Sequence, residues 1–154
     1  MSHQYSQLIA LTLICCLGQF GIDIVSPSLP AISAFYHISI NTAQWSMVIY
    51  LLSFSLSPAF YGPLADKLGR KKPLLCGLLL MLMGSIICTV ASTIIILIVG
   101  RLLQGLGAGA CVLWRTIFRD CFSGDELAKM GSYLGSLIMF IVPAAPLLGG
   151  VFQT

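Results

Sequence analysis

The chain has 154 residues, of which 58% are hydrophobic and only 8% are charged, and its formal net charge is +3. Soluble domains carry about 25% charged residues, and one soluble core of this size could not bury so much apolar surface. Disorder needs low hydrophobicity, and nucleic-acid binding needs a dense basic face, so neither is expected. The composition predicts an integral membrane protein whose partner is the lipid bilayer and that binds no nucleic acid.

The apolar runs are continuous, whereas strands of a membrane barrel alternate with polar residues, so the predicted class is all-α. The first run predicts a span over about residues 8–28. Asp23 is its only charged residue, and Pro27 and Pro30 lie near its end. The run is too long for the apolar segment of a signal peptide, so we expect it to be retained. A polar stretch over 33–42, with His37 and Asn41, follows.

Residues 43–64 form a second predicted span without any charge, which ends at the charged cluster from Asp66 to Lys72. The next stretch, 74–114, contains one charge, Arg101, in 41 residues. As a single helix it would be about 60 Å long, twice the hydrocarbon thickness of a bilayer. The chain must therefore fold back, and Ala91-Ser92-Thr93 is the polar interruption. We expect a third span over 73–91 and a fourth over 94–114.

A second charged stretch, 115–129, precedes the fifth predicted span, 130–152. Seven of the eight Lys and Arg residues lie in this stretch and in the cluster 67–72. The positive-inside rule places both clusters in the cytoplasm, and the two spans between them satisfy it. The prediction is a multi-pass protein of the cell inner (plasma) membrane with a cytoplasmic N-terminus and an outside C-terminus.

Asp23 and Arg101 are the two charges within spans, and each costs about 2.5–3.5 kcal/mol at a helix centre. Both fall in the outer half of the membrane at similar depth. Gln19 is one turn from Asp23, and Gln104 is one turn from Arg101, so each span has a polar face. We expect these four residues to line one cavity for protons and substrate. Two alternatives remain: boundary positions with Arg101 snorkelling outward, or a static structural ion pair.

Glycine pairs occur at the spacing that permits close helix approach: Gly105 with Gly109, and Gly131 with Gly135. Glycine is also simply frequent in membrane helices, which is the alternative explanation. The six cysteines show no CxxC spacing, so we expect neither a metal nor a cofactor. Sequence patterns of hydrolases, metalloproteases and ATPases are missing, and an enzyme is not expected.

The segment from Gly62 to Lys72 reads GPLADKLGRKK and predicts a tight cytoplasmic turn. Gly62 is expected to let a neighbouring helix approach closely, and Gly69 to supply backbone freedom. The Asp66 carboxylate is expected to pair with a base at the end of the fourth span, Arg115 or Arg119. An ordinary positive-inside loop is the alternative, but it would need neither the glycines nor the acid.

This segment resembles the loop 2–3 signature of the major facilitator superfamily, with Lys67 in place of the usual arginine. The resemblance implies a charge network that latches one conformation of an alternating-access cycle. The network residues it implies are Asp66, Gly69, Arg70 and Lys71.

Two further stretches agree with that family. Residues 101–109 resemble the span-four motif associated with proton coupling, and residues 23–32 are similar to the span-one motif of drug:proton antiporters. With residues 115–120 included, the chain is most similar to the bicyclomycin-resistance branch. In the span-five motif of antiporters Pro146, Gly149 and Gly150 fit, whereas Ile141 and Ala145 replace glycines. The resemblance implies a proton-coupled exporter of small drug-like molecules.

Members of this family have twelve spans in two six-helix halves. The five spans predicted here correspond to an incomplete N-terminal domain over 1–154, from a truncated or split frame, whose transport would need a separate C-terminal half. Two alternatives stay open. One is a small membrane scaffold or regulator, and the other is a nonfunctional remnant.

Overall fold

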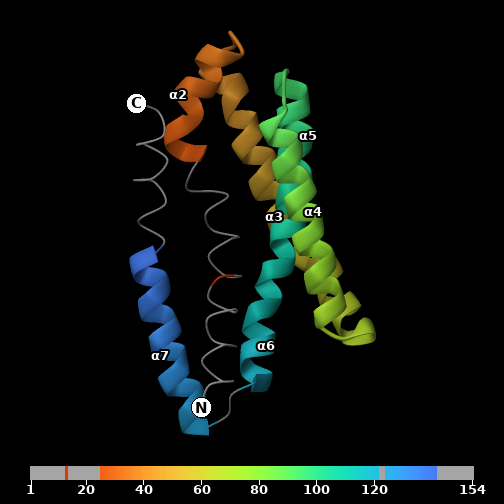
Figure 1. Cartoon of the computed structure of the whole chain (residues 1–154), viewed down its shortest axis with the longest axis vertical. Helices are drawn as coiled ribbons and strands as arrows, with labels where there is room; N and C mark the ends of the chain where they lie inside the picture. Colours follow the sequence, from red (N-terminus) through yellow and green to blue (C-terminus); the bar gives the residue numbers. More distant parts are fainter. Residues whose placement is uncertain (1–12, 14–24, 122–123, 142–154) are drawn as a thin grey trace.

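The computed structural model describes residues 13, 25–121 and 124–141, and every regular element within them is a helix (Figure 1). The predicted all-α class is confirmed for this part of the chain. In chain order the elements are α2 (Val25–Phe35), α3 (Ile40–Leu68), α4 (Lys71–Thr89), α5 (Ile94–Gly109), the 3-10 helix η1 (Ala110–Leu113), α6 (Trp114–Cys121) and α7 (Gly124–Ile141).

Three helical stretches of the described residues are long and apolar enough to cross a membrane: Ile40–Leu68, Lys71–Thr89 and Ile94–Asp120. The first two are α3 and α4, and the third joins α5, η1 and α6. They contain 29, 19 and 27 residues, and a helix needs about 20 to cross a bilayer. They coincide with the predicted spans 43–64, 73–91 and 94–114 to within two helical turns at each end.

The first and fifth predicted spans lie largely outside the described residues. Of 130–152, the structure describes 130–141, which belong to α7. Of 8–28, it describes Leu13 and 25–28, and α2 continues past them to Phe35, so the bounds of the first span stay a prediction. Pro30 lies inside α2. A proline inside a helix removes one N–H donor and crowds the carbonyl four residues earlier, and helices of membrane bundles tolerate both effects.

The chain turns between α2 and α3 at residues 36–39. His37 there has φ 52°, in the left-handed region. The hydroxyl of Ser33 donates to the Ile38 carbonyl at 2.6 Å. The Ser39 hydroxyl accepts from the amide of Thr42 at 3.2 Å and so caps the N-terminus of α3. Local hydrogen bonds thus form this turn within the polar stretch 33–42.

The break between α4 and α5 is present where the length argument required it. The Val90 amide donates to the Ile86 carbonyl at 3.2 Å and closes α4. Three residues later the Thr93 hydroxyl accepts from the Ile96 amide at 3.4 Å, as an N-cap of α5. One threonine side chain therefore suffices to restart the helix after the weak polar interruption.

The polarity of α3 is the reverse of that in a soluble helix. Ser46, Ser53 and Ser57 are at most 6% exposed, whereas Leu56 is 61% and Phe60 is 72% exposed. The buried hydroxyls of Ser46 and Ser53 donate to carbonyls of their own helix, so their burial leaves no hydroxyl proton unsatisfied. The large apolar side chains face outward, where lipid chains would cover them.

Helix α5 lies between α3 and α4 and packs against both (Figure 1). On the α4 side, four glycines meet in antiparallel register: Gly84 opposes Gly100, and Gly77 opposes Gly107. A Cβ at Gly84 would lie 2.7 Å from the Gly100 carbonyl oxygen, and one at Gly107 would lie 2.5 Å from that of Gly77. The backbones are therefore in direct contact, which only glycine permits.

On the α3 side, Gly105 and Gly109 make the close approach that their spacing predicted. A Cβ at Gly105 would meet the side chain of Ser53, and one at Gly109 would meet that of Ser57. The Ser57 hydroxyl also donates to the Leu106 carbonyl of α5 at 2.6 Å. This close-approach prediction is confirmed.

The second glycine pair behaves differently. A Cβ at Gly131 would have only an ordinary contact, 3.8 Å from Phe118, and one at Gly135 would meet nothing within 4 Å. Close approach at these two positions is not found among the described residues.

Candidate functional site

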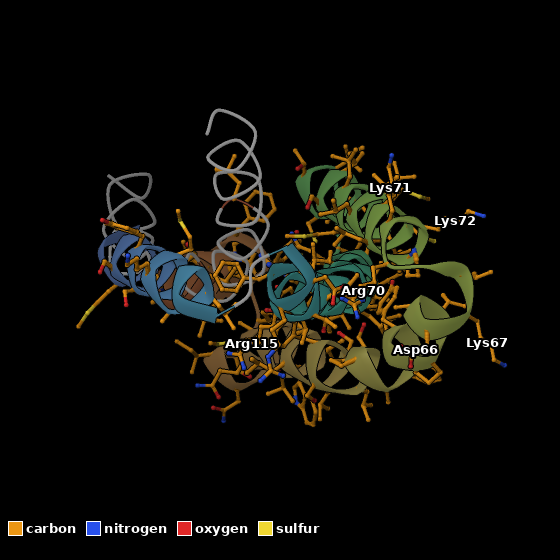
Figure 2. The ribbon with its side chains drawn as sticks, turned by 90° about the horizontal axis from the view of Figure 1, so that it is seen from below. Asp66, Lys67, Arg70, Lys71, Lys72 and Arg115 are labelled. Carbon is orange, nitrogen blue, oxygen red and sulfur yellow. The ribbon has the colours of Figure 1, made fainter. Side chains whose placement is uncertain are left out.

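The turn between α3 and α4 lies at the same end of the molecule as α6 (Figures 1 and 2). We call this end the basic end because it gathers six of the seven bases of the two charged clusters: Lys67, Arg70, Lys71, Lys72, Arg115 and Arg119. Helix α3 ends at Leu68 and α4 begins at Lys71, so Gly69 and Arg70 alone connect them. Gly69 has φ 77° and ψ 156°, a conformation nearly restricted to glycine. The predicted tight turn and the role of Gly69 in it are confirmed.

Arg70 joins this turn to α6. Its Nη1 donates to the Thr116 carbonyl at 2.8 Å and forms an ion pair with the Asp120 carboxylate. The side chains of Arg70 and Asp120 are 31% and 55% exposed. Figure 2 shows Arg70 pointing in toward α6, whereas Lys67 and Lys72 point away from the helices. A partly solvent-exposed ion pair of this kind stabilises the fold by only about 0–1 kcal/mol. Its main consequence is positional, because it holds α6 next to the α3–α4 turn.

The expected ion pair of Asp66 with Arg115 or Arg119 is wrong for this conformation. Within the described residues, Asp66 makes no ion pair with Arg115 or Arg119, and Arg70 is instead paired with Asp120. Ala65 occupies the buried face of α3, and Asp66, one step round the helix, is exposed. In Figure 2, Arg115 lies well away from Asp66.

The expected close approach of a helix to Gly62 is also wrong. A Cβ at this position would meet nothing within 4 Å among the described residues. Tyr61, rather than Gly62, continues the inward face of α3, where it packs with Ala65 and Leu74. Gly62 lies on a neighbouring, open face.

A polar network links α5 to α4 in the middle of the apolar helices. Arg101 Nη1 donates to Gln104 Oε1 at 2.8 Å, and Gln104 Nε2 donates to the Ser85 hydroxyl at 2.8 Å. The Ser85 hydroxyl donates in turn to the Met81 carbonyl at 2.9 Å. The shared face of Arg101 and Gln104 that their spacing predicted is confirmed by this contact. Ser85 was not singled out from the sequence, although it is one of the few polar residues in an otherwise apolar span.

Several predicted site residues lie outside the described residues. They are Gln19 and Asp23 on the first predicted span, and Pro146, Gly149 and Gly150 on the fifth. The cavity expected to join Asp23 to Arg101 therefore stays a prediction. Lys71 is exposed at the start of α4, beside the turn.

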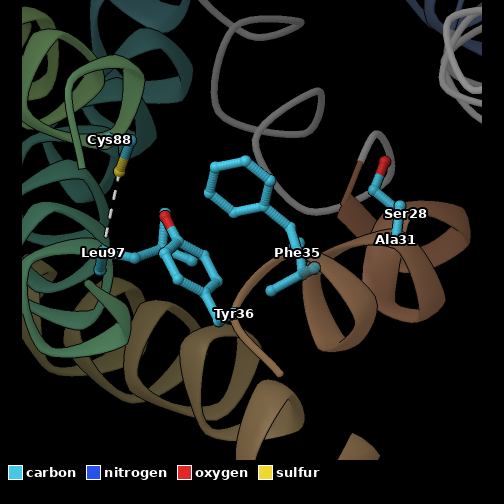
Figure 3. A pocket seen from close by; sticks show the side chains of 7 residues that line it. Ser28, Ala31, Phe35, Tyr36, Cys88 and Leu97 are labelled. Atoms are coloured by element: carbon cyan, nitrogen blue, oxygen red, sulfur yellow. Dashed lines mark hydrogen bonds between the residues drawn. The ribbon is translucent and has the colours of Figure 1, made fainter. Parts of the chain in front are cut away.

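The opposite end of the helices carries a pocket of about 390 Å³ between α2 and the α4–α5 connection (Figure 3). Its walls include Phe35, Tyr36 and Cys88, with no charged side chain among the lining residues. The Tyr36 hydroxyl donates to the Ala91 carbonyl at 2.8 Å, and the ring meets that of Phe35 edge-on at 4.9 Å. Burial, with a smaller contribution from Cys88, raises the pKa of Tyr36. The contact fastens the end of α2 to the break between α4 and α5.

The chain is similar to membrane transporters of bacteria and fungi. It is 36% identical over 141 residues to the uncharacterized MFS-type transporter YdgK of Bacillus subtilis, a match that covers 91% of this chain and 35% of the relative. It is 30% identical over 148 residues to multidrug resistance protein D of Escherichia coli, with 96% and 38% covered. It is 37% identical over 148 residues to the MFS-type efflux pump MMF1 of Pseudozyma antarctica, with 94% and 27% covered.

The chain thus spans roughly a third of the length of the curated relatives it matches, and it corresponds to their N-terminal part. The sequence profile of the Major Facilitator Superfamily matches residues 11–153, nearly the whole chain. The three apolar helices, the glycine-capped basic turn and the Arg101–Gln104 contact agree with that match. The chain belongs to the Major Facilitator Superfamily, a family of multi-pass membrane transporters.

Proposed function

We propose that these residues form the N-terminal part of a proton-coupled multidrug exporter that works by alternating access, of the bicyclomycin-resistance type. The observation that carries this proposal is the Arg101–Gln104–Ser85 network inside apolar helices of a chain related to multidrug efflux proteins. A guanidinium within a membrane-spanning helix is costly, and such residues generally serve ion or substrate pathways.

Asp23 and Gln19 complete the proposed pathway. An acid in a low-dielectric setting resists ionisation, while a nearby arginine favours it, so the balance can bring its pKa into the working range. A cationic substrate would then compete with a proton for Asp23, while Arg101 and Gln104 provide the opposing polar face. The partners of the whole transporter are protons, a small drug-like molecule and the C-terminal half of the fold.

The basic end serves as the conformational latch in this proposal. The Arg70–Asp120 pair and the Arg70–Thr116 bond tie the α3–α4 turn to α6. Asp66 and Lys71 are exposed beside them and available to a second half in another state of the cycle. A latch of modest energy is suitable, because the two states of a transporter must differ by only a few kcal/mol. In this proposal the helices span the inner membrane of the cell, and the basic end faces the cytoplasm.

The test uses a full-length version, built by joining this chain to the remaining C-terminal part of the E. coli relative. Proteoliposomes report efflux of a fluorescent cationic dye together with proton movement. Asp23→Asn is expected to abolish dye-driven proton movement, Arg101→Ala to reduce it strongly, and Arg101→Lys to keep part of it. Ser55→Ala, at an exposed serine of α3, is the matched control. Near-normal coupling in both Asp23→Asn and Arg101→Ala would refute the coupling role.

A further inference from the structure

The hydrogen bonds around Gln104 form a chain with one possible direction. Arginine has only donors, so Arg101 can be paired only with the amide oxygen of Gln104. The amide nitrogen then points to the Ser85 hydroxyl, where it needs an acceptor. The Ser85 proton is already directed to the Met81 carbonyl, which leaves its oxygen as that acceptor. The Met81 carbonyl of α4 and the Arg101 guanidinium thus impose the same orientation on the Gln104 amide from its two sides.

The backbone contact between α4 and α5 fixes the distance that the Ser85–Gln104 hydrogen bond has to span. A Cβ at Gly84, the residue before Ser85, would lie 2.5 Å from the amide nitrogen of Gln104 and 2.9 Å from its Cα. Nothing but hydrogen on Gly84 separates the two helices at this level. The Ser85 hydroxyl is thus held at hydrogen-bond distance from the Gln104 amide without bending either helix.

We propose that Ser85 is a positioning residue, which holds the Gln104 amide with its oxygen toward Arg101 and so fixes the guanidinium that the proposed function assigns to proton coupling. The role of Ser85 in proton coupling rests on the proposed function. The orientation of the Gln104 amide does not, and it can be measured independently. Without the hydroxyl, the nitrogen of the Gln104 amide has lost its acceptor, and the Arg101 contact alone holds the amide in this orientation. The amide then turns over more readily, and a turned amide presents N–H groups to a donor-only guanidinium.

The direct test is NMR spectroscopy of the 154-residue chain in lipid nanodiscs, with arginine side chains labelled with ¹⁵N. The chain has four arginines, and Arg101→Lys identifies the signals of Arg101 by their loss. A guanidinium held by a hydrogen bond rotates slowly and gives separate Nη signals. Ser85→Ala is expected to merge or shift the Nη signal of the Gln104 contact. Ser85→Thr, which keeps the hydroxyl, is expected to retain it.

Ser55→Ala is the matched control, because the Ser55 hydroxyl donates to a carbonyl of its own helix, that of Leu52, at 3.0 Å and is exposed. It should leave the Arg101 signals unchanged. Unchanged signals in Ser85→Ala, or the same change in Ser55→Ala, would overturn the positioning role.

The functional test is a double-mutant cycle in the full-length version. Ser85→Ala is expected to lower proton-coupled efflux about fivefold, as loss of one hydrogen bond does, and to have no further effect once Gln104→Ala is present. Equal losses in both backgrounds would overturn the proposal. If Gln104→Ala leaves coupling intact, the coupling role of the network fails instead, and the NMR result still decides whether Ser85 orients Gln104.

Discussion

Replacing Gly84 with alanine is expected to force α4 and α5 apart. The new Cβ would lie 2.5 Å from the Gln104 nitrogen, 2.7 Å from the Gly100 oxygen and 2.9 Å from the Gln104 Cα. All three are backbone atoms, which no change of side-chain rotamer can move. Ordinary contact begins near 3.4 Å, so the helices must separate by up to about 0.9 Å.

The separation has two measurable consequences. Overpacking of this size costs about 1–3 kcal/mol, against a gain of about 1 kcal/mol from the better helix propensity of alanine. The Ser85–Gln104 bond, now 2.8 Å, would also lengthen past about 3.5 Å and cease to be a hydrogen bond. We therefore expect a modest net loss of stability. We also expect the NMR signal of the Arg101 Nη atom that contacts Gln104 to merge or shift, as in Ser85→Ala.

Gly135→Ala is the matched control, because Gly135 also lies inside a helix, α7, but has open space around its missing Cβ. Both variants gain about the same helix propensity, so the difference in their free energies of unfolding isolates the helix contact. Equilibrium unfolding in mixed micelles, followed by circular dichroism, should show Gly84→Ala less stable than Gly135→Ala by about 1–3 kcal/mol. Equal stability of the two variants would refute the argument that backbone contact at Gly84 holds α4 against α5.

Three further outcomes are expected, two at the basic end and one for the membrane topology. Gly69→Ala, at φ 77° and ψ 156°, should cost about 1–3 kcal/mol in the same unfolding assay, and a neutral effect would contradict the strained turn. Arg70→Ala and Asp120→Asn should each change stability by less than about 1 kcal/mol yet impair efflux of the full-length version at near-normal expression, while unaltered efflux would reduce the pair to a surface contact. Alkaline phosphatase fused after Lys72 should be inactive and fused after Thr154 active, and the reverse pattern would invert the assigned topology.

The sequence by itself was sufficient for the helices and most of their ends in the middle of the chain. Charged residues are excluded from lipid, so the cluster after Leu64 had to end one span, and the length of 74–114 required a break. Gly69 ends α3 through its backbone conformation, and Thr93 begins α5 through its side chain. Both effects involve only residues that are neighbours in the sequence. The contact of Arg101 with Gln104 follows from helical spacing alone. A proline favours a helix end but does not require one, and Pro30 lies inside α2.

Only the tertiary structure decided which residues meet across helices. Asp66 and Arg70 are one helical turn apart in number, yet Arg70 reaches α6 and Asp66 does not. Gly62 and Gly84 are both glycines inside long apolar helices, yet of these two it is Gly84 that lies against the backbone of another helix. Such pairings depend on the rotation and axial shift of each helix, and these are set by how the glycines of α4 and α5 fit together. That fit is a property of two surfaces at once, so no pattern within one helix contains it.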